Sequence, residues 1–407
     1  MSIRQMPRDL LLLTLAMIIA NTATFMVTPL LPLYLASLGA SVEQVGLFFT
    51  LQVIMSVCFR ILGGWISDHL GRLQTIAIGG VMGMASLLGF TLAPTWGWAV
   101  IGALLSEIGG SLVGPSFQAF TAEKAPEGST SSTFGLVNAL FFICIIIGPL
   151  LGGFLAQNYG YRAMLWVATG IFAAATLIRI LMARGSAFAV RALHPAELVR
   201  DVRGLLALLA SGGLLMWLFI ADGLVDAGTQ LAIPFLPKFV TEVGGVSAFT
   251  YTALYAWTSF VSMLAMWPGG MVADRFGERR SIAFGALLFG IIWCVTVLKP
   301  NLTIFVIVFT LAGVAQSFIV PAFSSLVSKA VPRQSLGMTW GVYMTALGLL
   351  AVPAPYIGGL LYDNIAPAAA FILAGACMIA AAPLALWKLR LPAPAVAVKP
   401  VLEAVED

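Results

Sequence analysis

The chain has 407 residues, of which 60% are hydrophobic and 9% are charged. A typical soluble domain carries about 25% charged residues, so this composition excludes a soluble enzyme and indicates a protein that lies mostly in lipid. The formal net charge of +4 is small, and we expect no nucleic-acid partner.

Long runs without charge divide the chain into twelve predicted membrane-spanning helices. No charged residue lies between Asp9 and Glu43 or between Arg72 and Glu107, and each gap exceeds the roughly 20 residues that span a bilayer. In lipid a helix satisfies its own backbone hydrogen bonds, which favours helices over open strands. The predicted spans are 10–36, 43–67, 74–93, 97–121, 133–157, 162–183, 206–236, 249–272, 280–298, 302–327, 338–362 and 366–387.

The loops predict the orientation of these spans. Lysine and arginine are retained in cytoplasmic loops, and with the N-terminus inside, sixteen of them fall on the inner side and three on the outer side. Twelve spans place both termini on that same cytoplasmic side. We also expect the first helix to be retained, since its apolar run is too long for a signal peptide.

The second half of the chain repeats the first. Gly63, Gly64 and Asp68 recur as Gly269, Gly270 and Asp274, and Pro149, Gly152 and Gly153 recur as Pro355, Gly358 and Gly359, both at a shift of 206. At a shift of 205, Pro29, Pro32 and Gly39 match Pro234, Pro237 and Gly244. Six spans per half give the halves the same orientation, related by an axis along the membrane normal. The predicted domains are an N-terminal six-helix bundle (1–184), a cytoplasmic linker (185–204), a C-terminal six-helix bundle (205–390) and a disordered cytoplasmic tail (391–407).

Two motifs stand at fixed places in this pattern. A loop with two glycines and an aspartate follows the second span and recurs after the eighth, with Gly64, Asp68, Gly71 and Arg72 in the first copy and Gly270, Asp274, Arg275 and Gly277 in the second. The glycines permit close packing and a turn, and the aspartate can meet the positive end of a neighbouring helix. The fifth span carries Gly148, Pro149, Gly152 and Gly153, where the proline should bend the helix.

These motifs resemble those of the major facilitator superfamily over essentially the whole chain. The loops are similar to the GxxxDRxGR loop of that family, and the fifth span to the GPxxGG signature of its antiporters. The resemblance is to the bacterial twelve-helix drug/proton antiporter branch. It implies an all-α integral membrane protein of the bacterial inner membrane that works by alternating access, with the two loops as a cytoplasmic latch between the halves.

Ionisable residues at membrane depth are functional candidates, because each costs about 2.5 to 3.5 kcal/mol to insert. Asp222 and Asp226 stand four apart on the seventh span and share one face, where two close carboxylates cannot both ionise cheaply. This favours a proton carrier. Glu107 is a further candidate, and Arg60 is expected to form a buried charge pair. Arg179, near a helix end, is expected to snorkel to the surface.

Other polar residues in the predicted cavity helices are few. The repeat pairs Asp226 with Asn21, and the remaining candidates for the substrate cavity are Asn138, Gln230 and Gln316. So few donors disfavour a sugar site and favour a lipophilic or amphipathic small-molecule substrate. The chain contains no nucleotide-binding phosphate loop, so transport is expected to run on a gradient. Protons are the expected coupling ion because of the paired carboxylates. No cofactor motif and no metal-ligand spacing is present.

Three functions remain open on the sequence. The leading hypothesis is a monomeric proton-coupled exporter of lipophilic compounds in the lipid bilayer. A metabolite facilitator or lysolipid flippase would share the fold without needing the carboxylates. A non-transporting membrane receptor or scaffold would have no use for two latch loops and buried carboxylates.

Overall fold

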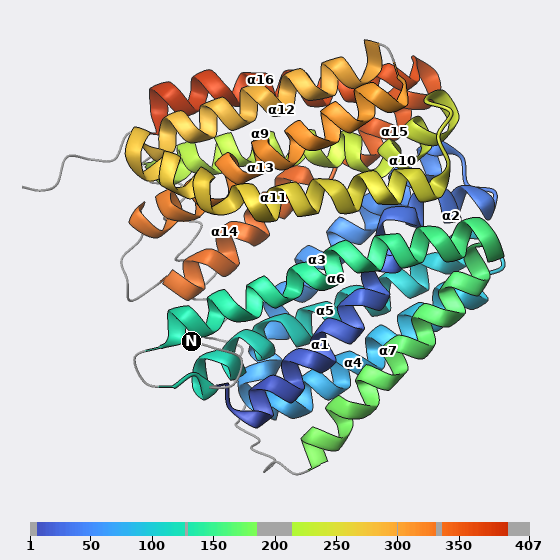
Figure 1. Ribbon diagram of the computed structural model, residues 1–407, viewed down its shortest axis with the longest axis vertical. Coiled ribbons are helices and arrows are strands. Elements are labelled where there is room, and N and C mark those ends of the chain that lie inside the picture. Colours follow the sequence, from blue (N-terminus) through green and yellow to red (C-terminus); the bar gives the residue numbers. More distant parts are fainter. Residues whose placement is uncertain (1–5, 127–128, 185–213, 299, 331–335, 390–407) are drawn as a thin grey trace, which may run out of the picture.

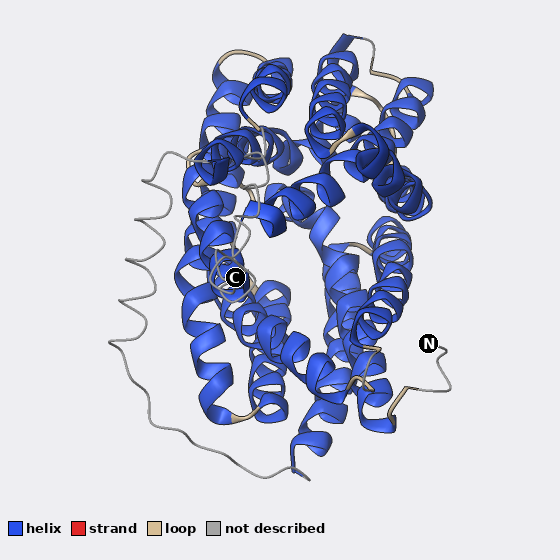
Figure 2. Cartoon of the chain, turned by 90° about the vertical axis from the view of Figure 1, so that its left-hand side faces the viewer, coloured by secondary structure: helices blue, strands red, loops and turns tan. Residues whose placement is uncertain are grey.

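The computed structural model describes residues 6–126, 129–184, 214–298, 300–330 and 336–389, with the backbone alone at 60–69, 130–131, 214–215, 328–330 and 336–342. Its elements form two stacked groups of helices (Figure 1). Every regular element in the described ranges is helical, as the turned view also shows (Figure 2). The predicted linker and the predicted tail lie outside the described residues.

The first half forms six long helical segments. They are α1 (Arg8–Val27) continued by η2 (Thr28–Leu30) and α2 (Leu31–Ser37), then α3 (Val42–Leu70), α4 (Arg72–Leu92), α5 (Trp96–Lys124), α6 (Thr130–Tyr159) and α7 (Tyr161–Arg184). These segments pack mainly on one another, most closely α4 on α5, and they form the lower group in Figure 1.

The second half repeats this order. It consists of α9 (Leu214–Ala232), η3 (Ile233–Phe235), α10 (Leu236–Lys238) and η4 (Phe239–Val243) in one segment, then α11 (Ala248–Phe276), α12 (Glu278–Leu298), α13 (Leu302–Ala330), α14 (Leu336–Ala351) with α15 (Ala354–Asn364), and α16 (Pro367–Lys388). Within the described residues, eleven segments are long and apolar enough to cross a membrane. The remaining long helix, α11, packs against α13 in its own half and against α6 of the other half.

The ends of the helices define two faces of the molecule. The terminal face carries Arg8, Leu70, Arg184 and Lys388, and the far face carries the turns that follow Ser37 and Tyr159 and the end of α15. Almost all the predicted boundaries agree with the observed helices to within four residues. The predictions succeeded because charges and turn residues interrupt the apolar runs at both faces.

Local geometry follows the repeat. Gly39 and Gly245, which the longer shift relates, have φ of 86° and 69°, and Gly71 and Gly277 both have φ of 90°. Only glycine adopts this region freely, so the same turns close the same helices in each half. Ser41 and Ser247, related by the same shift, cap α3 and α11 by accepting backbone hydrogen bonds from Gln44 and Thr250.

The one-residue change in the length of the repeat has a structural cause. The 3-10 turns η2 and η3 are related by the shift of 205. The glycine with positive φ that matches Gly39 is Gly245, at a shift of 206, whereas Gly244 has φ of −82°. The predicted pairing of Gly39 with Gly244 is therefore wrong by one residue. Between these points lies the π-helix η4, and a π-turn accommodates one extra residue within a continuous helix.

Glycines of the fifth segment bring helices into close contact. A Cβ at Gly152 would meet the backbone of Met26 on α1, and a Cβ at Gly153 would meet Thr252 on α11 of the other half. The repeat copies behave alike, because a Cβ at Gly358 would meet Leu231 on α9 and one at Gly359 would meet Val42 on α3. Each pair thus packs one helix within its own half and one across the seam.

Candidate substrate and proton site

A cavity with mostly apolar walls lies at the seam of the two halves, and we call it the central cavity. It has a volume of about 390 Å³. Phe25, Phe142 and Ile145 of the first half face it, together with residues of α11, α12 and α13. Its polar groups include Tyr255, Thr258, Ser259, Ser262 and Gln316.

Gln316 is the predicted polar candidate that lines the central cavity. Its Oε1 accepts a hydrogen bond of 3.1 Å from the Ser262 hydroxyl, which also approaches the Gly313 carbonyl at 3.2 Å. Gln316 is exposed. An apolar chamber with a few fixed hydroxyl and amide groups suits an amphipathic solute.

A second cavity lies inside the first half, and we call it the amino-half cavity. It has a volume of about 230 Å³ and is lined by α1, α3, α4, α5 and α7. Asn21, Gln52 and Arg179 face it. Arg179 is 2% exposed, so the expectation that it snorkels to the surface is wrong.

The predicted pair of carboxylates lies on α9. Asp222 is half-buried, and its Oδ2 accepts a hydrogen bond of 2.9 Å from the hydroxyl of Tyr343 on α14, which is fully buried. Asp226 and Gln230, one and two turns further on, are half-buried as well. None of the three lines either cavity described above. Asp222 thus connects α9 to α14, and α14 also packs against α3 of the other half.

The remaining candidates lie apart from this pair. Glu107 on α5 is half-buried and accepts a hydrogen bond of 3.1 Å from the Gln52 amide. Asn138 on α6 is exposed. The side chain of Arg60, which was expected to pair with a buried charge, lies outside the described side chains.

The hydrogen bonds between the halves, among the described residues, gather at the far face. The Asp363 carboxylate on α15 accepts from the backbone N–H of Glu43 at 2.9 Å, and the Gln157 amide oxygen on α6 accepts from the N–H of Phe249 at 3.2 Å. Both donors lie at helix N-termini, whose N–H groups lack partners within the helix. The repeat relates the two donors to each other and the two acceptors to each other, so we call these contacts the crossed caps.

Tyr356 adds two further bonds at this face. Its hydroxyl donates to the Glu43 carboxylate at 3.0 Å, and its backbone N–H donates to the Thr50 hydroxyl at 3.1 Å. These four bonds between described residues of the two halves therefore join α3 or α6 to α15 or α11 near the far face. The arrangement closes the seam on the far side.

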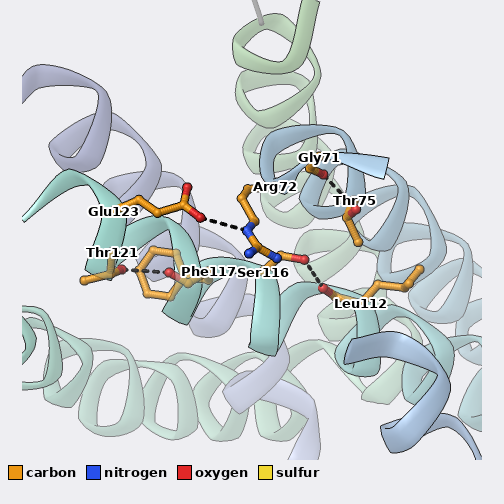
Figure 3. Close-up of polar contacts among 8 residues, drawn as sticks. All are labelled: Gly71, Arg72, Thr75, Leu112, Ser116, Phe117, Thr121 and Glu123. Carbon is orange, nitrogen blue, oxygen red and sulfur yellow. Dashed lines mark hydrogen bonds and ion pairs between the residues drawn. The ribbon is translucent and has the colours of Figure 1, made fainter. Parts of the chain in front are cut away.

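The predicted latch loops lie at the terminal face. Gly71 turns the chain, and the Arg72 Nε meets Glu123 of α5 at 3.1 Å within the same half (Figure 3). In the second copy Gly277 makes the same turn after Gly270, and Asp274 and Arg275 are exposed. Gly64 and Asp68 lie where the backbone alone is described, so the latch across the halves stays a prediction.

Sequence reasoning missed several contact residues. Gln157 and Asp363 carry no motif, but the repeat relates them to each other, as it relates Glu43 to Phe249, and this could have indicated matching roles. Tyr255 and Ser262 of the central cavity had no such signal, because the face of a helix that meets the seam depends on packing.

Comparison with known proteins gives a consistent result. A model of the Major Facilitator Superfamily matches residues 13–221 and 218–405. The multi-drug resistance efflux pump PmrA of Streptococcus pneumoniae is 21% identical over 87% of this chain and 89% of its own length. The multidrug resistance protein MdtG of Escherichia coli is 23% identical over 90% of both.

Solved structures agree on the fold. A peptide transporter POT in complex with alafosfalin superposes with a TM-score of 0.78 at 14% identity, covering 95% of both chains. A POT family transporter in complex with a thioalcohol conjugated peptide reaches 0.77 at 14% identity, over 93% of this chain and 96% of that one. At this identity the likeness concerns the fold, and the predicted fold of two six-helix bundles is confirmed.

Proposed function

Since the chain belongs to the Major Facilitator Superfamily, and is thus a membrane transporter and not an enzyme, we propose that it exports lipophilic or amphipathic small molecules in exchange for protons. The observation that carries this proposal is the central cavity, whose walls come from both halves. Its volume of about 390 Å³ lies within the range of about 300 to 1,000 Å³ for small-molecule sites. One relative named a multi-drug resistance efflux pump and another named a multidrug resistance protein support the same substrate class.

The transport cycle we propose is alternating access about this cavity. The crossed caps and Tyr356 hold the far side closed, so the described state accepts solute from the terminal side. Opening the far side requires these bonds to break while contacts form at the terminal face. The latch loops at Gly71 and Gly277 are placed to supply such contacts. One chain builds the whole cavity, which supports a monomer as the working unit.

The distribution of basic residues supports the orientation that we propose. On the terminal face the described basic residues are Arg8, Arg72, Lys124, Arg184, Arg275, Arg279, Arg280 and Lys388, whereas the far face has Arg162 and Lys238. Basic loops stay in the cytoplasm. The proposed location is the bacterial inner membrane with both termini cytoplasmic, and the described state then faces inward.

Proton coupling is assigned to Asp222 and Asp226. Asp222 reaches Tyr343 on α14, and α14 lies against α3 across the seam. Protonation removes the charge that the Tyr343 hydroxyl stabilises, which alters the contact between α9 and α14. Because α14 ends at the break before α15, α14 can shift against α3 at the seam without moving as one rigid helix with α15.

The test is gradient-driven transport in proteoliposomes. Purified protein is reconstituted with an imposed pH gradient, and the movement of a lipophilic cationic dye is measured together with the internal pH. Asp226→Asn removes the charge at nearly constant volume, so we expect loss of gradient-driven dye transport with dye binding retained. Asp222→Asn should give a smaller loss, because Asp226 still titrates.

The matched control is Glu242→Gln, which neutralises an exposed carboxylate at the far face. It should leave transport unchanged. Full gradient-driven transport by Asp226→Asn would overturn the proton assignment. Dye equilibration by the unaltered protein at the same rate with and without the gradient would overturn the antiport and indicate a facilitator.

A further inference from the structure

The amino-half cavity contains a buried cation, Arg179, for which the described side chains provide no counter-ion. Arg179 is 2% exposed, and its Nε has no hydrogen-bond partner in the part of the chain that the structure describes. Its Nη2 lies 3.1 Å from the Met17 sulfur, and its guanidinium lies over the Phe172 ring at 5.6 Å. No carboxylate pairs with it among the described residues.

This arrangement is unusual on physical grounds. A charge removed from water is retained at low cost only when a partner or several hydrogen bonds compensate it. A thioether is a weak acceptor, and one aromatic ring replaces part of the lost solvation. The protein therefore supplies less compensation for Arg179 than a buried arginine requires.

The repeat indicates that the fold itself does not need this arginine. The residue at the matching place in the second half is Ala385, which is fully buried on α16. At the same shift of 206, the residue that matches Gly83 is Phe289 and the residue that matches Ser86 is Ile292. Phe289 and Ile292 line the central cavity, so the second half also has an open space at the matching place, but these side chains are apolar and no arginine or lysine lines that space among the described residues.

The cavity in front of Arg179 carries further donors. Asn21 and Gln52 contribute amides, and Ser86 and Ser106 contribute hydroxyls. The Gln52 amide already donates to Glu107 at 3.1 Å, which leaves its second hydrogen, and Glu107 itself does not line the cavity. Several groups that can donate a hydrogen bond thus line the cavity, and none of its described lining residues is a carboxylate.

The volume limits what can enter. About 230 Å³ corresponds to roughly eight waters at about 30 Å³ each, or one compact organic anion. Gly110 lines the cavity, is exposed, and a Cβ there would meet nothing within 4 Å, so the cavity is accessible beside it. The Nε and Nη2 edge of a guanidinium binds a carboxylate through two parallel hydrogen bonds.

We propose that the amino-half cavity is a binding site for a small carboxylate anion, held by the Nε and Nη2 edge of Arg179. The carboxylate displaces the weak contact with the Met17 sulfur and supplies the missing counter-charge. It is either a free anion or the acidic end of a transported solute. The site is separate from the central cavity and does not depend on proton-coupled export.

The test uses benzoate and its uncharged analogue benzamide as probes. Binding to the purified full chain is measured by calorimetry in a buffer without other carboxylates. Benzoate should bind and benzamide should not. Arg179→Gln should weaken benzoate binding by about 10-fold to 100-fold, the loss expected for a charge-assisted hydrogen-bond pair. The control Arg184→Gln removes an exposed charge on the same helix and should bind benzoate normally.

Thermal unfolding separates a ligand role from a structural one. Without benzoate, Arg179→Gln should unfold at the same or a higher temperature, because it removes an uncompensated buried charge. Benzoate should raise the unfolding temperature of the unaltered protein but not that of Arg179→Gln. Gly110→Leu, which keeps Arg179 and places a side chain in the open space, should also lose benzoate binding.

Transport assays distinguish the two sources of the carboxylate. If the anion is free, benzoate changes the transport of an uncharged dye, and Arg179→Gln removes this effect. If the carboxylate belongs to the solute, Arg179→Gln lowers transport of a carboxylated dye and spares its ester. The proposal is overturned if benzoate fails to bind the unaltered protein, if it binds Arg179→Gln equally well, or if Arg179→Gln unfolds far earlier yet is still stabilised by benzoate.

Discussion

The crossed caps allow us to predict how far the loss of one hydrogen bond shifts the equilibrium between far-closed and far-open molecules. In Asp363→Ala the N-terminus of α3 loses an acceptor at 2.9 Å from the Glu43 N–H. Loss of such a cap costs about 0.5 to 2 kcal/mol, and a carboxylate at a helix N-terminus contributes about 0.3 to 1 kcal/mol. Because Asp363 is exposed, we take about 1 kcal/mol, which lowers the ratio of far-closed to far-open molecules about fivefold.

The assay measures distances between spin labels on the two halves. One pair, at Thr95 and Glu242, reports on the far face, and another, at Lys124 and Arg280, reports on the terminal face; all four positions are exposed. The labels require replacement of the native cysteines Cys58, Cys144, Cys294 and Cys377. Asp363→Ala should increase the fraction of molecules with a long distance at the far face. The fraction with a short distance at the terminal face should increase together with it.

Two control variants sharpen this prediction. Gln157→Ala removes the matching cap, a neutral bond of 3.2 Å, and at about 0.5 kcal/mol should change the ratio about twofold. Asn364→Ala removes a neighbouring amide that bonds only within its own helix, to the Leu360 carbonyl, and should change nothing. If Asp363→Ala and Asn364→Ala give the same distances, the crossed caps do not hold the far face closed.

Two further predictions concern stability. Gly152→Val should prevent stable folding, at a cost above about 3 kcal/mol, because a Cβ there meets the Met26 backbone; Gly170→Ala, on a helix with open space around it, should raise the unfolding temperature. Arg72→Gln should change the free energy of unfolding by less than about 1 kcal/mol, because its pair with Glu123 is partly exposed; a larger loss would indicate that Arg72 has a structural role beyond this ion pair.

The sequence predicted the helices well because hydropathy is a local property. The expected 97–121 and 280–298 are observed as Trp96–Lys124 and Glu278–Leu298. Irregular backbone was missed where its cause is not local. The expected 338–362 is interrupted between α14 and α15 at residues 352–353, and the seventh segment contains the π-helix η4, which the one-residue slip in the repeat could have indicated.

The candidate sites were harder to predict, because spacing fixes which residues share a face but not what that face meets. Asp222 and Asp226 were expected on one face, yet the Tyr343 partner of Asp222 lies 121 residues away and could not be assigned. Arg179 was misjudged for a related reason. Its distance from the helix end suggested a route to water, and the packing of α4 and α1 around it removes that route.

The contact between Asp222 and Tyr343 allows coupling to be tested apart from binding. Tyr343→Phe removes the hydroxyl that donates to Asp222 at 2.9 Å and keeps the buried ring that packs against Phe219. If this bond transmits the protonation of Asp222 to α14, the variant should still bind and exchange the dye but should accumulate less of it for a given pH gradient. Loss of a hydrogen bond to a charged group, about 1.5 to 3 kcal/mol, corresponds to a coupling ratio lower by about tenfold or more.

The matched change is Tyr362→Phe, which removes the hydroxyl of a tyrosine that is also buried and packs against Phe235. No hydrogen bond of the Tyr362 hydroxyl is found among the described residues, so its loss should leave the coupling ratio unchanged. The coupling ratio, which is the number of dye molecules accumulated per proton moved, is measured in the same proteoliposomes for both variants. An unchanged coupling ratio in Tyr343→Phe would show that protonation of Asp222 does not move α14 through this hydrogen bond. Asp226 would then be the carboxylate of the pair to which proton coupling is assigned.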